Sequence, residues 1–317
     1  TPAVIFGGND SNDNSGVLKY VRVEFAGIEL TPNNETNSIT MGGVGKGTTM
    51  EYCQVSFGGD DGFEWFGGTI NSKHLISFAM WDDDFDVDYG YSGLNQFGLA
   101  VRYPSYADQS GSNGFETDNG PNDNDVAPYT TGVFSNYTII GPKLTSAQSI
   151  NANFQHAMDM RRRTAVTIAN SVFAGFPRGL RMNQPSVLSN YQNNTGALFN
   201  NIMLADAQTF TAGSGMNAND VKTYWEANNE VSTSADYATV IAGWGLNPNI
   251  FFGNNVSTAY SPSPSFTVTS GALLTGANFT NSKVNSSFFT QVPYRGAFGA
   301  TNWTAGWAEF NPINKAY

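Results

Sequence analysis

This chain of 317 residues is poor in cysteine, in histidine and in charge. It has one cysteine (Cys53), two histidines (His74 and His156) and 13% charged residues. A single cysteine forms no disulfide within the chain, and we expect Cys53 to be a small buried apolar residue in its strand-like run. The two histidines fall at different points of the repeat described below, so they do not predict a two-histidine metal site.

Basic residues and long apolar runs are also scarce. Lysine and arginine total 15 against 26 acidic residues, which gives a net charge of −11. This acidity argues against binding to nucleic acid or to anionic membrane surfaces. No run of about 18 apolar residues is present, so no membrane span is predicted. Because the numbering starts at Thr1 inside a strand-like run, we expect further coils and a secretion signal or lipid anchor upstream.

What the chain does contain is a short repeated phrase that places a bulky apolar residue beside a charged one. The step from Phe63 to Phe85 is 22 residues, and the longer steps contain Gly/Asn/Pro-rich insertions. Period-two alternation indicates a strand with one side chain inward and the next outward, and its recurrence is typical of a solenoid. The repeats are Gly62-Phe63-Glu64-Trp65, Asp84-Phe85-Asp86-Val87, Gly114-Phe115-Glu116-Thr117, Ala157-Met158-Asp159-Met160 and Gly179-Leu180-Arg181-Met182.

A second repeat supports the first. Its six runs each begin with Tyr, His or Asn and continue through apolar or alternating residues; they start at Tyr20, Tyr52, His74, Asn136, Asn170 and Asn201. Two strand ladders joined by turns predict an all-β protein, a right-handed parallel β-helix with loop insertions. We expect Asn136, Asn170 and Asn201 to form an asparagine ladder at a tight turn.

The repeat divides the chain into two parts of one domain. Residues 1–206 are predicted to form the β-helix coils, and residues 207–317 the degenerate last coils and a C-terminal capping region. Short helices are expected at Asn219–Asn228, with Asn219 or Asp220 near its N-cap, and at Ala235–Ala242. The aromatic tail Tyr294–Trp307 is expected to cover the last coil. Insertions at 28–37, 103–113, 117–128 and 143–153 are predicted to be loops.

Stacked coils would also stack their outward charges. Glu64, Asp86, Glu116 and Asp159 are predicted to form an acidic ladder on one face. Repulsion between carboxylates at strand spacing is relieved by a proton or by a cation such as Ca²⁺. The metal candidates are Asp60, Asp61, Asp82, Asp83, Asp84, Asp86 and Asp88. The alternative is a solvated acidic face that keeps the sheet soluble.

Binding, catalysis and a structural role all remain open at this level. For an extracellular glycan or peptide, the candidate contacts are Trp65, Trp81, Glu64, Glu116 and Tyr91, and Phe66 and Tyr89 are further aromatics beside the acids. An enzyme would use two of Asp61, Asp83, Asp84 and Asp86, or, as a Ca²⁺-dependent polysaccharide lyase, a base among Arg102, Arg161 and Arg181. Arg161 is expected to pair with the acidic ladder. A filament-forming subunit is the third possibility.

Four phrases resemble one known group of proteins. Gly16–Gly27, Gly58–Gly68, Trp81–Asp86 and Tyr294–Gly299 resemble secreted or cell-surface right-handed β-helix proteins of Bacteroidetes-type bacteria. Some of those are lipoproteins encoded beside TonB-dependent outer-membrane uptake systems, and most have no assigned activity. The resemblance implies an extracellular or outer-membrane-surface location. We therefore expect a non-catalytic protein that binds a glycan or peptide, or docks onto such an uptake complex.

Overall fold

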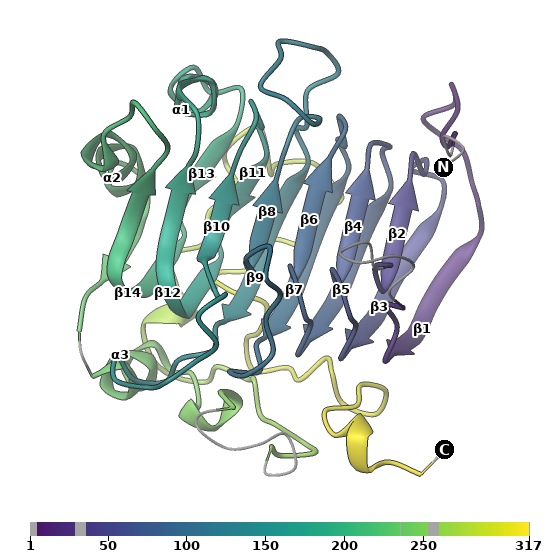
Figure 1. The fold of residues 1–317 in the computed structure, drawn as a ribbon. Helices are drawn as coiled ribbons and strands as arrows, with labels where there is room; N and C mark the ends of the chain where they lie inside the picture. The colour runs from purple at the N-terminus through teal and green to yellow at the C-terminus, as the bar shows by residue number, and fades with distance from the viewer. Residues whose placement is uncertain (1–4, 29–35, 235, 253–259, 317) are drawn as a thin grey trace.

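The chain folds into a parallel β-helix, as the sequence predicts (Figure 1). The structure is a computed structural model that describes residues 5–28, 36–234, 236–252 and 260–316. Its strands join into one 15-stranded sheet, and the pairings within it are parallel. Most of the predicted loop at 28–37 lies outside the described residues, whereas strands are broken after Val101, after Thr117 and after Ile140 where loops were predicted.

The strands stack into two ladders, which we call the front ladder and the long ladder. The front ladder contains β2 (Ile39–Gly42), β4 (Phe63–Phe66), β6 (Phe85–Asp88), β8 (Phe115–Thr117), β10 (His156–Met160) and the second halves of β12 (Val172–Met182) and β14 (Ile202–Ala212). The long ladder contains β1 (Val17–Glu24), β3 (Thr49–Ser56), β5 (Asn71–Phe78), β7 (Leu94–Val101), β9 (Val133–Ile140), the first halves of β12 and β14, β15 (Glu230–Ser232), and β11 (Thr167–Ala169) with β13 (Ala197–Phe199).

Each long strand bends at one residue with left-handed backbone geometry. In β1, β3, β5, β7 and β9 these residues are Tyr20, Tyr52, His74, Phe97 and Asn136, and in the later coils they are Asn170 and Asn200. The first four rings stack, with centroids 4.8, 4.2 and 5.2 Å apart in turn. Asparagine follows because it tolerates this geometry. The predicted ladder is therefore correct at Asn136 and Asn170 but shifted at the third position, where Asn200 and not Asn201 has the positive φ.

The interior of the coil is filled by the apolar half of the repeated phrase. Residues at equivalent positions of β4, β6, β8, β10 and β12 lie in register and have no exposed surface: Phe63, Phe85, Phe115, Met158 and Leu180. The long strands β5, β7 and β9 bury most of both faces; in β5, Leu75 points into the coil while its neighbour Ile76 packs outside it. This two-sided burial is typical of parallel sheets.

Within the described ranges, three α-helices flank the coils: α1 (Pro185–Gln192), α2 (Ala218–Glu226) and α3 (Tyr237–Trp244). Val221 and Trp225 of α2 join the interior core at the last coil, so α2 closes that end. Its N-cap is Asn217, whose side chain accepts from the Asn219 backbone, and not the predicted Asn219 or Asp220. None of the helices in the described ranges is long and apolar enough to cross a membrane.

The C-terminal segment, residues 260–316, contacts the last coil through Arg295, whose Nη1 lies 2.7 Å from Oε1 of Glu230 in β15, but it extends far beyond the predicted cover over that coil. We call it the C-terminal strap, because it runs back along the outer side of the long ladder to the first coil (yellow in Figure 1). Its backbone forms hydrogen bonds with side chains of successive long strands. Gln96 Nε2 donates to the Thr290 carbonyl, and Gln54 Oε1 accepts from the Glu309 amide. In the first coil, Arg22 Nη1 donates to the Trp307 carbonyl at 2.7 Å. The strap takes this path because the outward apolar side chains of the long strands need a cover.

Candidate cation-binding site on the front ladder

The predicted acidic ladder is confirmed by the strand register. Glu64 of β4 lies opposite Asp86 of β6, which lies opposite Glu116 of β8, which in turn lies opposite Asp159 of β10. Neighbouring parallel strands are about 4.8 Å apart, so successive carboxylates are stacked at nearly that spacing. The ladder changes sign in the next coil, where Arg181 faces Asp159.

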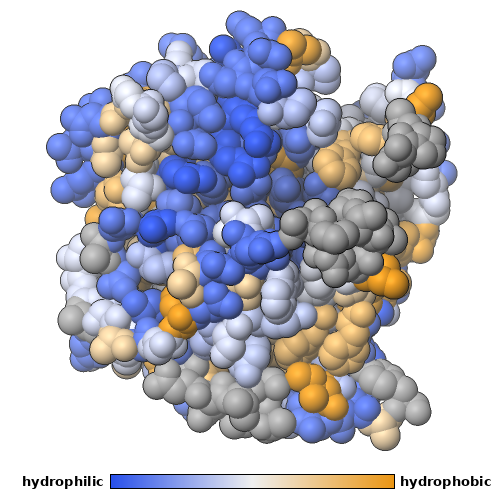
Figure 2. Space-filling model, viewed as in Figure 1, coloured by the Kyte–Doolittle hydropathy of each residue, from blue (hydrophilic) through white to orange (hydrophobic). Residues whose placement is uncertain are grey.

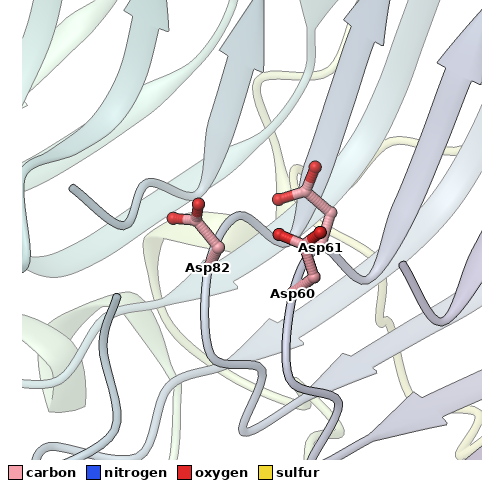
Figure 3. A group of neighbouring side chains, drawn as sticks. All are labelled: Asp60, Asp61 and Asp82. Atoms are coloured by element: carbon pink, nitrogen blue, oxygen red, sulfur yellow. The ribbon is translucent and has the colours of Figure 1, made fainter. Parts of the chain in front are cut away.

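More carboxylates come from the turns that precede β4 and β6. Figure 3 shows Asp60 and Asp61 on one turn and Asp82 on the next. Hydrogen bonds fix these turns, because Asp61 Oδ1 accepts from the Asp83 backbone at 2.9 Å and Asp83 Oδ1 accepts from the Asn113 backbone. Three trios have carboxylate oxygens within 4.8 Å of one another: Asp60–Asp61–Asp82, Asp61–Glu64–Asp86 and Asp83–Asp86–Glu116. These seven residues are the acidic cluster.

Burial and mutual repulsion both raise the pKa values in the acidic cluster. Desolvation is the main cause for Glu64, whose pKa rises to about 8, and for Asp82, whose pKa rises to about 6. The pKa values of Asp61 and Asp86 are raised well above the ordinary aspartate value, first by burial and then by neighbouring carboxylates. A low dielectric environment disfavours each charge, and like charges nearby disfavour it further.

Among the described residues, the ion pairs of arginine with the ladder lie in its later coils. Arg161 pairs with Glu116 and Asp118, in line with the predicted role of Arg161, and Arg181 pairs with Asp159. By contrast, five members of the acidic cluster form no ion pair with any lysine or arginine in the described part of the chain: Asp61, Glu64, Asp82, Asp83 and Asp86. The uncompensated charge is thus concentrated between β4 and β6.

Two oxygens of the acidic cluster are buried without a hydrogen-bond partner among the described residues. They are Oδ1 of Asp82 and Oδ1 of Asp86, and Asp86 belongs to two of the three trios. Calcium binds oxygen ligands at about 2.3–2.6 Å, so two ligands of one ion lie within about 5 Å of each other. The 4.8 Å separation within each trio satisfies this limit. The donor set is chemically suited to Ca²⁺.

Two of the predicted metal ligands lie elsewhere. Asp84 precedes β6 and turns away from the cluster: it accepts from Ser77 Oγ at 2.6 Å and pairs with Arg102 at 3.2 Å, with no exposed surface on either partner of the pair. Asp88 lies at the far end of β6, where it accepts from the backbone of Gly120. The expectation that Asp84, Asp86 and Asp88 share one face is wrong because Asp84 lies in the turn, where strand alternation does not apply.

The aromatic candidates for ligand contact are mostly core residues. Trp65 and Tyr91 have no exposed surface, and their rings pack together at 5.5 Å inside the coil. This placement disagrees with the expectation that they contact a ligand. Trp81 is half-buried beside the acidic turns, where its Nε1 donates to Asp108 at 2.7 Å and its ring meets Tyr106 edge-on.

Asn113 is a further residue beside the acidic cluster that sequence reasoning missed. Its Oδ1 accepts from the His156 backbone at 2.9 Å, which continues the contacts that Asp61 and Asp83 make in earlier coils. The signal was present in the sequence, because Asp61, Asp83 and Asn113 each stand two positions before the inward phenylalanine of their coil.

Comparison with protein families agrees with this architecture. A family model described as a pectate-lyase-like β-helix domain matches residues 2–247, which include every strand. The chain belongs to this family. No curated protein and no solved structure gives a significant match. Pectate-lyase-like β-helix domains are united by their fold, and a fold does not by itself assign an activity. The chemistry of this member must therefore be argued from its own acidic cluster.

Proposed function

We propose that this protein is a non-catalytic extracellular binding protein whose acidic cluster holds Ca²⁺. The observation that carries the cation is Asp86, which has a buried unpartnered oxygen and is shared by two carboxylate trios. A divalent ion would neutralise carboxylates that otherwise have to be protonated. Calcium is preferred over magnesium because it accepts many oxygen ligands in irregular geometry, whereas magnesium requires a near-ideal octahedron.

The extracellular location and the ligand are also part of this proposal. The location is supported by the resemblance of the Gly58–Gly68 and Trp81–Asp86 phrases to secreted β-helix proteins of Bacteroidetes-type bacteria. The ligand is a glycan or peptide held by the loops that flank the front ladder, and a TonB-dependent uptake complex is the partner that the same resemblance suggests. Loops mounted on a rigid solenoid are well placed for binding.

Binding is favoured over lyase chemistry because the candidate arginine bases are already held in ion pairs. Each of the three candidate bases is engaged with a carboxylate: Arg102 with Asp84, Arg161 with Glu116 and Asp118, and Arg181 with Asp159. An arginine held in an ion pair is stabilised in its charged form and makes a poor proton acceptor.

Calorimetric titration with CaCl₂ tests the cation. Wild-type protein should bind Ca²⁺, and Asp86→Asn should weaken binding by roughly tenfold or more because it removes a ligand shared by two trios. Glu226→Gln is the matched control, since it removes one negative charge from an exposed pair with Lys222. Absence of binding heat, together with a melting temperature that chelator leaves unchanged, contradicts the calcium site.

A polysaccharide panel tests the absence of catalysis. Purified protein with Ca²⁺ should release no reducing ends and no unsaturated products. Degradation that is abolished by the double variant Asp83→Asn, Asp86→Asn would replace the binding proposal with an enzymatic one.

A further inference from the structure

A second surface, separate from the acidic cluster, lies where the chain leaves the front ladder. The turns after β2, β4 and β6 pass through glycines with positive φ: Gly43, Gly67, Gly68 and Gly90. A side chain at Gly68 would place its Cβ 2.5 Å from the Val44 carbonyl oxygen. We call this surface the glycine corner. Because these glycines have no side chains, the backbone of the turns is left uncovered beside the neighbouring aromatic rings.

Three adjoining pockets form a continuous depression at the glycine corner. Their volumes are about 520, 220 and 320 Å³. The first and second share Tyr89 and Pro128, and the first and third share Gly43 and the segment 7–10. Figure 2 shows hydrophobic surface near the upper ends of β2 and β4, beside the strongly hydrophilic surface over the middle of the front ladder.

An aromatic strip lines this depression. The ring of Phe66 lies 5.9 Å from that of Phe6 and 5.7 Å from that of Tyr89. Phe6 is 50% exposed and Tyr89 is 49% exposed, so the strip presents ring surface to solvent. Phe66 and Tyr89 come from consecutive coils, which sets the rings along the axis of the solenoid.

The remaining lining combines glycines and polar side chains with apolar residues such as Val126 and Pro128, and it carries almost no charge. Asp10 and Asp13 are the charged residues among the described residues that line the three pockets, and none of the lining residues is lysine or arginine. The side-chain amides of Asn122 and Asn124, both exposed residues, lie at the rim beside Tyr89. An anionic ligand finds no counter-charge here and would be repelled by the acidic cluster.

We propose that the glycine corner binds an uncharged saccharide chain. A pyranose ring offers an apolar C–H face and a rim of hydroxyl groups, which match exposed rings beside amides and bare backbone. The inference deepens the proposed function and rests on it: it assigns the glycan to one of the loop surfaces that flank the front ladder, apart from the acidic cluster, and it requires no cation.

Affinity electrophoresis in gels containing neutral polysaccharides tests this proposal. The neutral panel is laminarin, mannan, hydroxyethyl cellulose and starch, and polygalacturonate is the anionic comparison; each is run with Ca²⁺ and with EDTA. Wild-type protein should be retarded by at least one of the neutral polysaccharides in both conditions. Tyr89→Ala should weaken the interaction by roughly tenfold or more, as for removal of an aromatic anchor. Tyr20→Ala, which removes an equally exposed tyrosine at the first coil, should leave retardation unchanged.

Three results would overturn the saccharide site. They are no retardation by any member of the panel, retardation that survives Tyr89→Ala, and retardation only by polygalacturonate in the presence of Ca²⁺. The last two leave calcium binding intact, and calcium binding is judged separately by the titration with Asp86→Asn. Failure of one proposal is therefore distinguishable from failure of the other.

Discussion

Arg102 and Asp84 form an ion pair with no exposed surface, immediately beside the acidic cluster. Nη1 of Arg102 lies 3.2 Å from Oδ1 of Asp84, and the guanidinium lies over the ring of Phe154. Burial raises the pKa of Asp84 to about 6, an effect that Arg102 and Ser77 oppose. The pair thus keeps the Asp84 carboxylate buried and away from the acidic cluster, while its sequence neighbour Asp83 belongs to the cluster.

Breaking this pair should be costly, and replacing both partners much less so. Arg102→Met should lower the free energy of unfolding by about 3–5 kcal/mol, because it leaves a buried carboxylate without its counter-charge. The double variant Asp84→Asn, Arg102→Met should recover much of the loss. Urea denaturation measures both. Lys222→Met, at an exposed pair, should change stability by less than about 1 kcal/mol. A double variant as unstable as the single one would contradict this account.

Stability should fall as pH rises when no divalent cation is present. The pKa of folded Glu64 is raised from 4.5 to about 8, so the folded state binds more protons than the unfolded state between these values. The stabilisation is complete below pH 4.5 and is lost as pH rises through about 8. Melting temperatures in EDTA should therefore fall across this window. Ca²⁺ should flatten the slope, and so should Glu64→Gln; an unchanged slope in Glu64→Gln would contradict the assignment.

The C-terminal strap should contribute substantially to stability. Phe298 is buried, and its ring stacks on Trp303 at 4.9 Å and on Phe266 at 5.3 Å. Phe298→Ala should lower the free energy of unfolding by about 3–5 kcal/mol and should make the strap susceptible to protease. Val126→Ala, at a 61% exposed position, should change it by less than about 0.5 kcal/mol. Equal effects of the two variants would show that the strap is not firmly packed.

Gly98 and Tyr137 should show strong mutational coupling. Gly98 lies in register between Leu75 and Tyr137, and a Cβ on it would fall 1.9 Å from the tyrosine ring. Gly98→Ala should therefore destabilise by about 1–3 kcal/mol through overpacking. Tyr137→Ala should relieve the clash, so that Gly98→Ala costs less in that background than in the wild type. A double-mutant cycle measures the difference, and simple additivity would contradict the packing argument.

The sequence was most informative where a local pattern determines structure. Alternation with period two, recurring from coil to coil, predicted that Phe63 and Phe85 point inward and that Glu64 stacks on Asp86. The same alternation places Trp65 with Phe63 in the core. Trp65 was assigned to a ligand surface because of its aromatic chemistry, although the alternation already predicted that it points inward. Side-chain direction in a strand follows the backbone, whatever chemistry the side chain carries.

The features that escaped prediction depend on contacts distant in sequence. The strap follows the long ladder because of apolar side chains that precede it by some 200 residues, and no local pattern encodes that route. Likewise, Asp84 resembles its acidic neighbours in sequence, and only the position of Arg102 in the following coil turns it inward. The glycine corner was missed because the contact between the rings of Phe66 and Tyr89 joins two coils, and no local pattern shows it.

The strap also changes how the solenoid should unfold. In a plain solenoid each coil contacts only its neighbours, so end coils can fray independently and folding can propagate from any point. Here Arg22 in the first strand bonds a carbonyl 285 positions later, and the strap contacts nearly every coil between. Because the strap links the coils, unfolding of one coil should destabilise the others. We therefore expect a single cooperative transition, and a native state that is completed only after the strap has been synthesised.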